Sequence, residues 1–308
     1  MRSDRYKNES AGKHDASGST PAANPPEQPV SSPEPAKKRK KKHPVRDFLY
    51  RLVMFILLVV ICVSGYKIYQ TVSEYLKARN TYNAVSQTAH VDPNQFTGVV
   101  DFDELLKINP DVQGWLYQKD TVINYPVVQG RDNEQYLHTL VDGTWGGGGT
   151  LFVDFRNQPD FQDFNSIIYG HHMKDGSMFR CLRGYTKEKN YYSSHKQLEL
   201  ITPNAKYHLL VFSAYITPAD SELAYKLFFD SDAEKRDYLD QTFAASQITT
   251  DLSRDDVDVS DKIITLSTCA YDYEEARYVV ICKAVPWTEE EIAAGKKLQM
   301  QIDEQEGR

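Results

Sequence analysis

The residues of this chain that could do chemistry are a cysteine, a histidine and an arginine, each placed beside an apolar run. Cys269 follows the β-branched, apolar run Lys262–Thr268, which predicts a strand. Arg277 begins the next apolar run, so the short interval predicts a hairpin with Cys269 and Arg277 facing each other across its mouth. A thiol, an imidazole and a guanidinium together can perform acyl transfer through a thioester. The guanidinium could stabilise a thiolate or the oxyanion of a tetrahedral intermediate.

The histidine follows a third predicted strand. Asn165–Tyr169 has strand composition, Gly170 interrupts it, and His171–Phe179 predicts a loop that enters a helix. An imidazole just past a strand end is exposed enough to exchange protons and held well enough to aim them. Taken singly, Cys269 is better explained as a buried structural cysteine and His171 as a solvated loop residue. The combination with Arg277 favours catalysis.

These residues, with several flanking motifs, resemble the sortases, the cysteine transpeptidases of Gram-positive cell surfaces. The shared features are Tyr169-Gly170-His171, Thr265-Leu266-Ser267-Thr268-Cys269 and the downstream Arg277. Further motifs resemble class B in particular: Asn109–Trp115, Tyr125–Gln129 and Ile168–Phe179. The resemblance extends from about Phe102 to Trp287, which is most of the chain beyond its N-terminal apolar segment.

The resemblance implies a mainly β fold, a closed sortase-type barrel with short helices and an inserted helix before the last two strands. It implies that Cys269 is the nucleophile, His171 the catalytic histidine and Arg277 the active-site arginine. Catalysis is assigned to His171 rather than to His172 because His171 directly follows the Tyr-Gly pair.

The implied reaction cleaves a sorting signal in a surface protein through a thioacyl-enzyme. An amine of a peptidoglycan precursor, or a pilin lysine, would then resolve the intermediate. We expect Asn157, Tyr169 and Ser267 to line the substrate groove, because each stands at or near the end of a predicted strand.

The N-terminal region predicts a disordered, basic, cytoplasmic tail over residues 1–43. Residues 1–36 are rich in Ser, Pro, Ala, Asn and Lys and nearly lack large apolar side chains, so they cannot bury enough surface to offset the entropy of ordering. The run Lys37–Lys42 follows, and such a run alone would indicate nucleic-acid binding. Because an apolar segment follows at once, we expect a membrane and no nucleic acid as partner.

That apolar segment predicts a single-pass transmembrane anchor over residues 44–69. Its uncharged core, Leu52–Tyr66, is shorter than the roughly 20 residues that span a bilayer, but its apolar flanks extend it if Arg51 and Lys67 snorkel. Positive charge before the core keeps the N-terminus in the cytoplasm and places the catalytic domain outside. A cleaved signal peptide is the alternative; the absence of an A-x-A cleavage pattern favours an uncleaved anchor.

Beyond the anchor, residues 70–100 predict a helical juxtamembrane segment, residues 101–288 one catalytic domain, and residues 289–308 a polar tail with frayed helical character. The catalytic domain opens with a short helix over residues 101–108, which has an acidic first turn. The short β runs that follow include residues 121–128, 151–155, 197–202 and 206–216. Closing them into a barrel would remove exposed strand edges.

Two further patterns concern the interior of this domain. A helical period over Ala233–Phe243 predicts the inserted helix, which would form one side of the groove. The run Gly146–Gly149 predicts a flexible turn into a strand rather than a phosphate-binding loop, because neither a helix nor a Lys-Ser/Thr pair follows it.

The four cysteines do not predict a disulfide framework. Cys62 lies in the predicted anchor, which leaves Cys181, Cys269 and Cys282 outside, and an odd number permits one free, reactive thiol. No Cys/His spacing matches a zinc site, and the acidic pairs Asp255-Asp256 and Glu274-Glu275 are more typical of solvated charge than of calcium ligands. We therefore expect no metal and no cofactor.

Two other functions remain open from the sequence. One is a cell-wall cysteine endopeptidase of the papain-like type, in which the nucleophile normally precedes the histidine, whereas here His171 precedes Cys269. The other is a non-catalytic, membrane-anchored assembly protein that kept the barrel and lost its chemistry. The presence of all three polar groups counts against this second alternative.

Overall fold

The structure is a computed structural model that describes residues 44–92, 94–269 and 275–307. The predicted tail 1–43 and the segment 270–274, which includes Glu274, lie outside the described residues. The described residues divide into two units, 44–58 and 59–307, and the whole barrel belongs to the second.

The predicted anchor, 44–69, and the first part of the predicted helical juxtamembrane segment, 70–100, form one uninterrupted helix, α1, which ends at Thr88 (Pro44–Thr88). Its 45 residues correspond to a length of about 68 Å, roughly twice the thickness of the apolar layer of a bilayer. The apolar side chains from Phe48 to Tyr69 are exposed, and among the described residues α1 is the one helix long and apolar enough to cross a membrane. α1 ends just before His90, which has a left-handed backbone (φ 57°).

The last turns of α1 pack against the barrel rather than standing apart from it. The Tyr82 hydroxyl donates to the carbonyl of Gly149, and the Tyr82 ring meets that of Tyr125 edge-on, with centroids 5.1 Å apart. Near the same end of α1, Asn124 Nδ2 donates to Ser86 Oγ at 3.2 Å. Tyr82 is 6% exposed, so this end of the helix belongs to the hydrophobic core.

The run Gly146–Gly149, predicted as a flexible turn, is closely packed at its two ends, Gly146 and Gly149. Gly149 has a φ of +55°, and a Cβ there would lie 2.3 Å from the carbonyl oxygen of Tyr136. At Gly146 a Cβ would lie 2.6 Å from the Leu140 side chain. Glycine is required here because the backbone passes directly over other atoms, and the turn does lead into a strand, as predicted.

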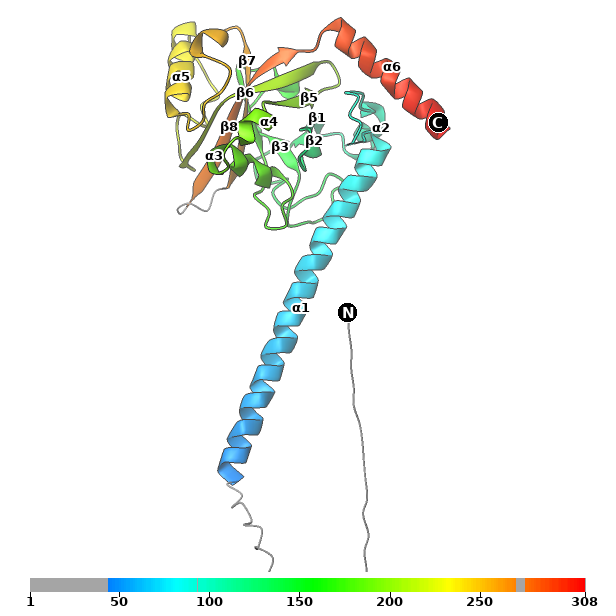
Figure 1. The fold of residues 1–308 in the computed structure, drawn as a ribbon, viewed down its shortest axis with the longest axis vertical. Helices are drawn as coiled ribbons and strands as arrows, with labels where there is room; N and C mark the ends of the chain where they lie inside the picture. The colour runs from blue at the N-terminus through cyan, green and yellow to red at the C-terminus, as the bar shows by residue number, and fades with distance from the viewer. Residues whose placement is uncertain (1–43, 93, 270–274, 308) are drawn as a thin grey trace, which may run out of the picture. The chain divides into compact units, whose positions relative to one another are not determined.

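The predicted closed barrel is confirmed (Figure 1). The strand order around it is β1-β2-β3-β4-β7-β8-β6-β5, and β5 pairs with β1 to close it. The β2/β3 and β4/β7 pairs are parallel and the others antiparallel. The strands are β1 Val112–Tyr117, β2 Asn124–Gln129, β3 Leu151–Val153, β4 Asn165–Tyr169, β5 Gln197–Ile201, β6 Lys206–Pro218, β7 Lys262–Cys269 and β8 Ala276–Pro286.

Besides β2, which begins at Asn124 rather than at Thr121, two strands differ from prediction. β1 was not among the predicted strands, because Gln113 and Gly114 interrupt its apolar residues, yet Trp115 and Leu116 at its centre are fully buried. β3 ends at Val153 rather than at Phe155, because the chain turns at Asp154. Tertiary packing defines the first strand, and a local polar turn ends the second.

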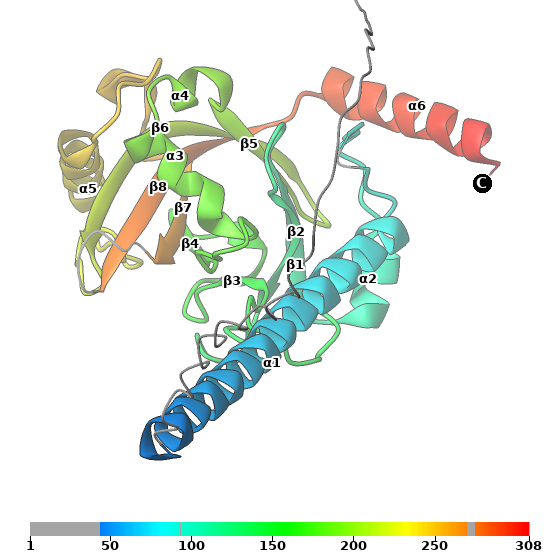
Figure 2. The ribbon, with the colours of Figure 1, turned by 60° about the horizontal axis from the view of Figure 1, so that its bottom comes forward.

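Short helices cover the barrel. The predicted first helix is α2, Phe102–Ile108, whose N-cap Asp101 accepts the Glu104 N–H at 3.0 Å. The predicted inserted helix is confirmed as α5, Asp232–Ala245, between β6 and β7; it packs against β6, where Ser213 Oγ donates to the Thr242 carbonyl at 2.9 Å (Figures 1 and 2). The smaller helices are η1 Pro159–Phe161, η2 Phe179–Arg183, α3 Gly184–Lys187, α4 Tyr191–Ser194 and η3 Arg254–Asp256.

The C-terminal segment, predicted as a polar tail with frayed helical character, forms an 18-residue helix, α6, Glu289–Glu306. Thr288 and Glu291 close its N-terminus with a capping box. Farther along, Gln299 is buried and accepts the Thr97 hydroxyl at 2.8 Å. The sequence indicated helical character here but not a regular helix of this length.

Candidate active site

A cavity of about 500 Å³ lies at one edge of the barrel, where β4 and β7 end and β8 begins. Of the predicted residues, His171, Arg277, Tyr169 and Ser267 line it. The remaining lining comes from three segments of the chain that are far apart in sequence: Asn133 and Leu137; Phe152 and Arg156; and Ala219–Glu222 with Tyr225, together with Gly170 and Thr268.

The predicted hairpin of β7 and β8 is confirmed, with Cys269 directly opposite Arg277 in the ladder. The Cys269 side chain lies outside the part of the chain that the structure describes. β4 runs parallel to β7, with Tyr169 opposite Ser267, and the Gly170 N–H donates to the Ser267 carbonyl at 3.1 Å. Because parallel strands end at the same edge, His171 and Cys269 both leave the barrel at this edge.

Gly170 allows the chain to leave β4 where it does. A Cβ at this position would lie 2.5 Å from the Leu151 side chain and 2.6 Å from that of Phe179, both fully buried. The loop then folds back on itself, because the Phe179 N–H donates to the His171 carbonyl at 3.0 Å. His171 is therefore fixed at both its flanks, which an imidazole needs in order to aim a proton.

The His171 ring lies between a carbonyl and a second imidazole. Nε2 lies 2.7 Å from the carbonyl oxygen of Leu137, and because a carbonyl only accepts, Nε2 carries a proton in this arrangement. The ring stacks on that of His138, with centroids 5.4 Å apart. Burial lowers the pKa of His171; the Leu137 carbonyl opposes this shift and the charge of His138 adds to it. The imidazole is thus biased toward its neutral form, which can accept a proton.

The adjacent His172 lies on the other side of the loop. It is 4% exposed, its ring stacks on Tyr278 with centroids 5.6 Å apart, and Nε2 lies 2.5 Å from Arg180 Nη1. A guanidinium only donates, so Nε2 of His172 is an acceptor here. The structure therefore places one histidine of the pair at the cavity and the other in the packed interior.

Tyr169 and Ser267, both predicted to bind substrate, line the cavity through hydroxyl-bearing side chains that are already bonded. Ser267 is 2% exposed, and its Oγ lies 2.9 Å from the Tyr225 hydroxyl. The Tyr169 hydroxyl donates to Asp154 Oδ2 at 3.0 Å. Burial, with the Asp154 carboxylate beside it, raises the pKa of Tyr169, so this hydroxyl stays protonated and acts as a donor.

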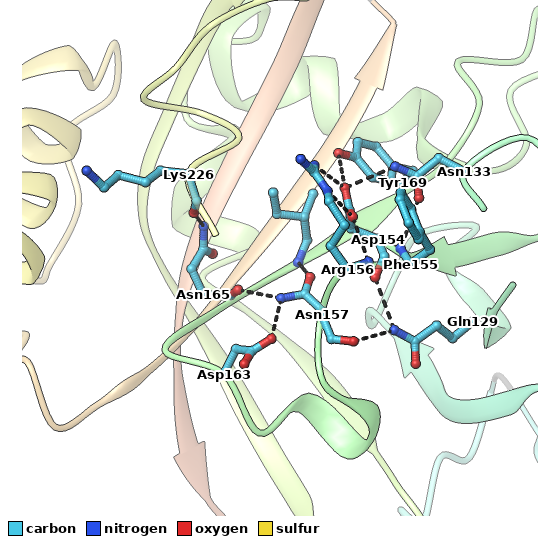
Figure 3. A network of polar contacts seen from close by, with 11 residues as sticks. Gln129, Asn133, Asp154, Phe155, Arg156, Asn157, Asp163, Asn165, Tyr169 and Lys226 are labelled. Atoms are coloured by element: carbon cyan, nitrogen blue, oxygen red, sulfur yellow. Dashed lines mark hydrogen bonds and ion pairs between the residues drawn. The ribbon is translucent and has the colours of Figure 1, made fainter. Parts of the chain in front are cut away.

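Asn157, the third predicted substrate-binding residue, lies away from the cavity lining. It is 4% exposed; its Nδ2 donates to Asp163 Oδ2 at 2.7 Å and to the Asn165 carbonyl at 2.9 Å, and its Oδ1 accepts the Ile167 N–H at 3.0 Å (Figure 3). The observed contacts hold the β3–β4 connection against β4. Direct substrate contact by Asn157 stays a prediction.

Sequence reasoning missed several lining residues, notably Asn133, Leu137, Arg156 and Tyr225. Asp154-x-Arg156 at the end of a predicted strand is the one local signal among them, since charges two apart at a strand end can pair. Asn133 and Leu137 lie on a loop that carries no such pattern, and only the closed barrel brings this loop beside β4.

The other cysteines provide a contrast to the predicted nucleophile. Cys62 is exposed on α1, Cys181 is half-buried and Cys282 is buried, and all three are free thiols. Burial raises the pKa of Cys181 to about 11 and that of Cys282 further still. Neither thiol outside α1 is therefore activated, which leaves Cys269 as the candidate nucleophile.

Two further observations concern possible metal binding and a second hollow in the molecule. In the part of the chain that the structure describes, no group of three His, Cys, Asp or Glu residues could hold a metal ion. A larger hollow of about 1160 Å³ is bordered by α1, α6 and the loop around Asp175; the described residues predicted for the active site are not part of its lining.

Comparison with known protein families gives one match over most of the barrel: the sortase domain, at residues 118–285. Two sequence relatives are the sortase B of Staphylococcus aureus, 37% identical over 238 residues, and that of Listeria monocytogenes, 33% identical over 252 residues. The first alignment covers 76% of this chain and 96% of the relative, and the second covers 78% and 98%.

Solved structures agree with these matches. A sortase B–substrate complex from Staphylococcus aureus has a TM-score of 0.62 and 34% identity, covering 70% of this chain and 100% of that one. The sortase B of Clostridium perfringens has a TM-score of 0.56 and 33% identity, covering 60% of this chain and 100% of that one.

Proposed function

The chain belongs to the sortase family, in class B, and we propose that it is a membrane-anchored cysteine transpeptidase that cleaves a sorting signal and transfers the acyl part to an amine. One observation carries this proposal. Cys269 and Arg277 are paired at the end of the β7–β8 hairpin, and Arg277 and His171 line one cavity at the same edge.

In the first step, the Cys269 thiolate attacks a backbone carbonyl carbon of the sorting signal. The C–S bond forms as the carbonyl oxygen takes the negative charge, which the Arg277 guanidinium stabilises. His171 takes up the thiol proton and gives it to the departing amine as the C–N bond breaks. The products are a thioacyl-enzyme and the free C-terminal part of the signal.

In the second step, an amine attacks the thioester carbonyl. His171 takes the proton of the incoming amine, a new amide bond forms, and the C–S bond breaks to return the Cys269 thiolate. The lowered pKa of His171 favours this role, because the neutral ring is available as a base at the start of the step. Water would give hydrolysis instead.

The partners follow from the family and from the position of the site. The acyl donors would be surface proteins with a C-terminal sorting motif. The acceptor would be an amine of a peptidoglycan precursor, as in anchoring of proteins to the cell wall, or a pilin lysine in pilus assembly. Tyr169 and Ser267 would contact the donor peptide, since both side chains line the cavity.

We further propose that α1 anchors the enzyme with its N-terminus in the cytoplasm and its barrel outside the cell. The cluster of positive charge at Lys37–Lys42, with Arg46, precedes the exposed apolar side chains from Phe48 to Tyr69 in α1. Basic residues on one side of an apolar helix are retained in the cytoplasm. A protease added to intact cells should therefore cleave a tag at the C-terminus and leave an N-terminal tag intact.

The function is tested with the full-length protein in detergent, incubated with a panel of sorting-motif peptides and a small amine. Mass spectrometry should find a cleaved peptide joined to the amine and an acyl adduct on Cys269. Hydrolysis without transfer would favour the endopeptidase alternative. Absence of any adduct across the panel would favour the non-catalytic alternative.

Two variants test the assigned roles. Cys269→Ala should abolish acyl transfer, because no other activated thiol is present among the described cysteines. Arg277→Ala should lower kcat/KM by about 100- to 1,000-fold, as loss of an oxyanion donor does elsewhere, without unfolding the domain. Full activity in purified Cys269→Ala protein would disprove the mechanism.

A further inference from the structure

One buried carboxylate joins three groups that line the active-site cavity. Asp154 is fully buried at the end of β3, and Asn133, Arg156 and Tyr169 all point their polar groups at it (Figure 3). Asn133 Nδ2 and the Tyr169 hydroxyl both donate to Oδ2 at 3.0 Å. Each of these three residues lines the cavity, whereas Asp154 does not.

Arg156 forms a bidentate ion pair with Asp154. Arg156 Nε donates to Oδ1 of Asp154 and Nη2 donates to Oδ2, each at 2.8 Å. This bidentate geometry fixes the plane of the guanidinium. A guanidinium has five N–H donors and this ion pair uses two of them. The Arg156 side chain is 42% exposed and lines the cavity, so part of its donor capacity is left for a ligand.

The backbone around Asp154 is also fixed. Oδ1 accepts the Arg156 N–H at 3.1 Å, and Asn133 Oδ1 accepts the Phe155 N–H at 3.0 Å. From β2, Gln129 Nε2 donates to the Asp154 carbonyl at 3.1 Å. Burial alone would raise the pKa of the Asp154 carboxyl, but the hydrogen bonds from Arg156, Asn133 and Tyr169 outweigh it and leave the pKa lowered. The Asp154 carboxylate is thus charged at neutral pH, and both of its oxygens accept hydrogen bonds.

We propose that Asp154 is a positioning residue for peptide binding, which holds Asn133, Arg156 and Tyr169 as one preformed wall of the groove. We name these four residues the Asp154 wall. Its accessible N–H donors, chiefly those of Arg156, bind oxygen acceptors of the donor peptide, that is, backbone carbonyls or side-chain amides and carboxylates. This inference rests on the proposed function, because it assigns one wall of that same groove.

Preformation explains why a buried carboxylate is used here. A flexible arginine and asparagine lose side-chain entropy when they bind a ligand, and that loss lowers the affinity. Asp154 fixes both before the peptide arrives. Asp154 itself is too deep to touch the peptide, so removing its charge changes affinity through the three groups it holds and leaves the chemistry at Cys269 intact.

The test compares variants of the full-length protein in detergent. The probe is a fluorescent form of the sorting-motif peptide that the wild-type enzyme cleaves, and its Kd is measured in a Cys269→Ala background so that no turnover occurs. Asp154→Asn should weaken binding about tenfold, which corresponds to the loss of one charge-assisted hydrogen bond. With Cys269 present, KM should rise with little change in kcat, and alkylation of Cys269 by iodoacetamide should keep its wild-type rate.

Two other variants keep the test decisive. Arg156→Lys retains the charge and loses the fork, so it should weaken binding several-fold even if Asp154→Asn folds poorly. Asp163→Asn is the matched control: this carboxylate lies in the same β3–β4 connection and accepts the Asn157 amide at 2.7 Å, but it holds no residue of the cavity lining. Its peptide Kd should equal that of the parent.

Three results would overturn the proposal. They are an unchanged peptide Kd in folded Asp154→Asn and Arg156→Lys proteins, an equal loss in Asp163→Asn, or a fall in the alkylation rate that parallels the fall in activity. Failure of the proposed function looks different, since it appears in the otherwise wild-type enzyme as the absence of an acyl adduct on Cys269.

Discussion

The loop after β4 carries two adjacent histidines, one on each face, and the two imidazole rings have different partners. On the cavity face, His171 stacks on the exposed His138, and its Nε2 bonds a carbonyl. On the interior face, His172 stacks on the buried Tyr278 and accepts from Arg180. Successive residues point to opposite sides of an extended chain, so adjacent imidazoles acquire different partners and different tasks.

The difference shows how the barrel positions a catalytic group. Tyr278 directly follows Arg277 on β8, and His172 directly follows His171. The stacked pair His172–Tyr278 therefore connects the two chain segments that carry His171 and Arg277. The interior face provides rigidity, whereas the cavity face provides a ring that can change its protonation state.

The largest expected effect is on catalysis, and it distinguishes the role of His171 from that of His172. His171→Ala should lower kcat/KM for acyl transfer by about 100- to 10,000-fold, because it removes the proton carrier. The thermal unfolding midpoint should stay near that of the parent, since the ring faces the cavity. Peptide cleavage assays and thermal unfolding of the same samples measure both quantities.

His172→Ala is the counterpart. It removes a buried ring, so it should lower the free energy of unfolding by about 2–4 kcal/mol, while the folded fraction retains more activity than His171→Ala. The opposite pattern, in which His172→Ala is stable and inactive and His171→Ala unstable and active, would reverse the assignment of the two histidines.

A smaller effect is expected at Gly170, which directly precedes the two histidines. Gly170→Ala should lower the free energy of unfolding by about 1–3 kcal/mol, because the added methyl group would overlap the Leu151 and Phe179 side chains. Activity should fall too, since the loop that carries both imidazoles must shift. Thermal unfolding and the cleavage assay measure the two consequences.

Gly147→Ala is the control for this substitution. A Cβ at Gly147 would meet only Glu74 Oε2, at 3.8 Å, so stability should change by less than about 1 kcal/mol. If the two variants had equal stability, close packing at Gly170 would not be what fixes the loop.

Individual strands and helices could be predicted from local sequence signals, whereas the closed barrel was predicted from the resemblance to sortases. The β-branched runs at Lys262–Thr268 and Asn165–Tyr169 are strands as predicted, and the helix between β6 and β7 lies where its period placed it. β1 was missed because burial of Trp115, which leaves no periodic pattern, defines it, and the Thr97–Gln299 contact of α6 could not be predicted because it joins residues 202 positions apart.

The site was predictable only in part for a related reason. The motifs around His171, Cys269 and Arg277 lie at strand ends, where a single sequence segment defines the position. Asp154 and Asn133 meet across 21 positions of sequence, and their contact depends on barrel closure. Asn157 shows a second limit of sequence-based prediction. A polar residue after a strand can face inward and hold a turn as readily as it can face a ligand.

The smallest expected effect concerns the His138–His171 stack. When protonated, His138 disfavours a second positive charge on His171 and so lowers its pKa. His138→Gln should therefore raise the pKa of His171, by less than burial lowers it, and the limb of the pH–activity curve that follows His171 should move to higher pH. An NMR titration of the His171 ring measures the shift directly.

His138→Phe keeps a ring without a charge and should give the same rise, whereas His138→Lys keeps the charge and should hold the pKa of His171 low. A titration that moved in His138→Gln but not in His138→Phe would mean that the stack, rather than the charge, tunes the catalytic imidazole.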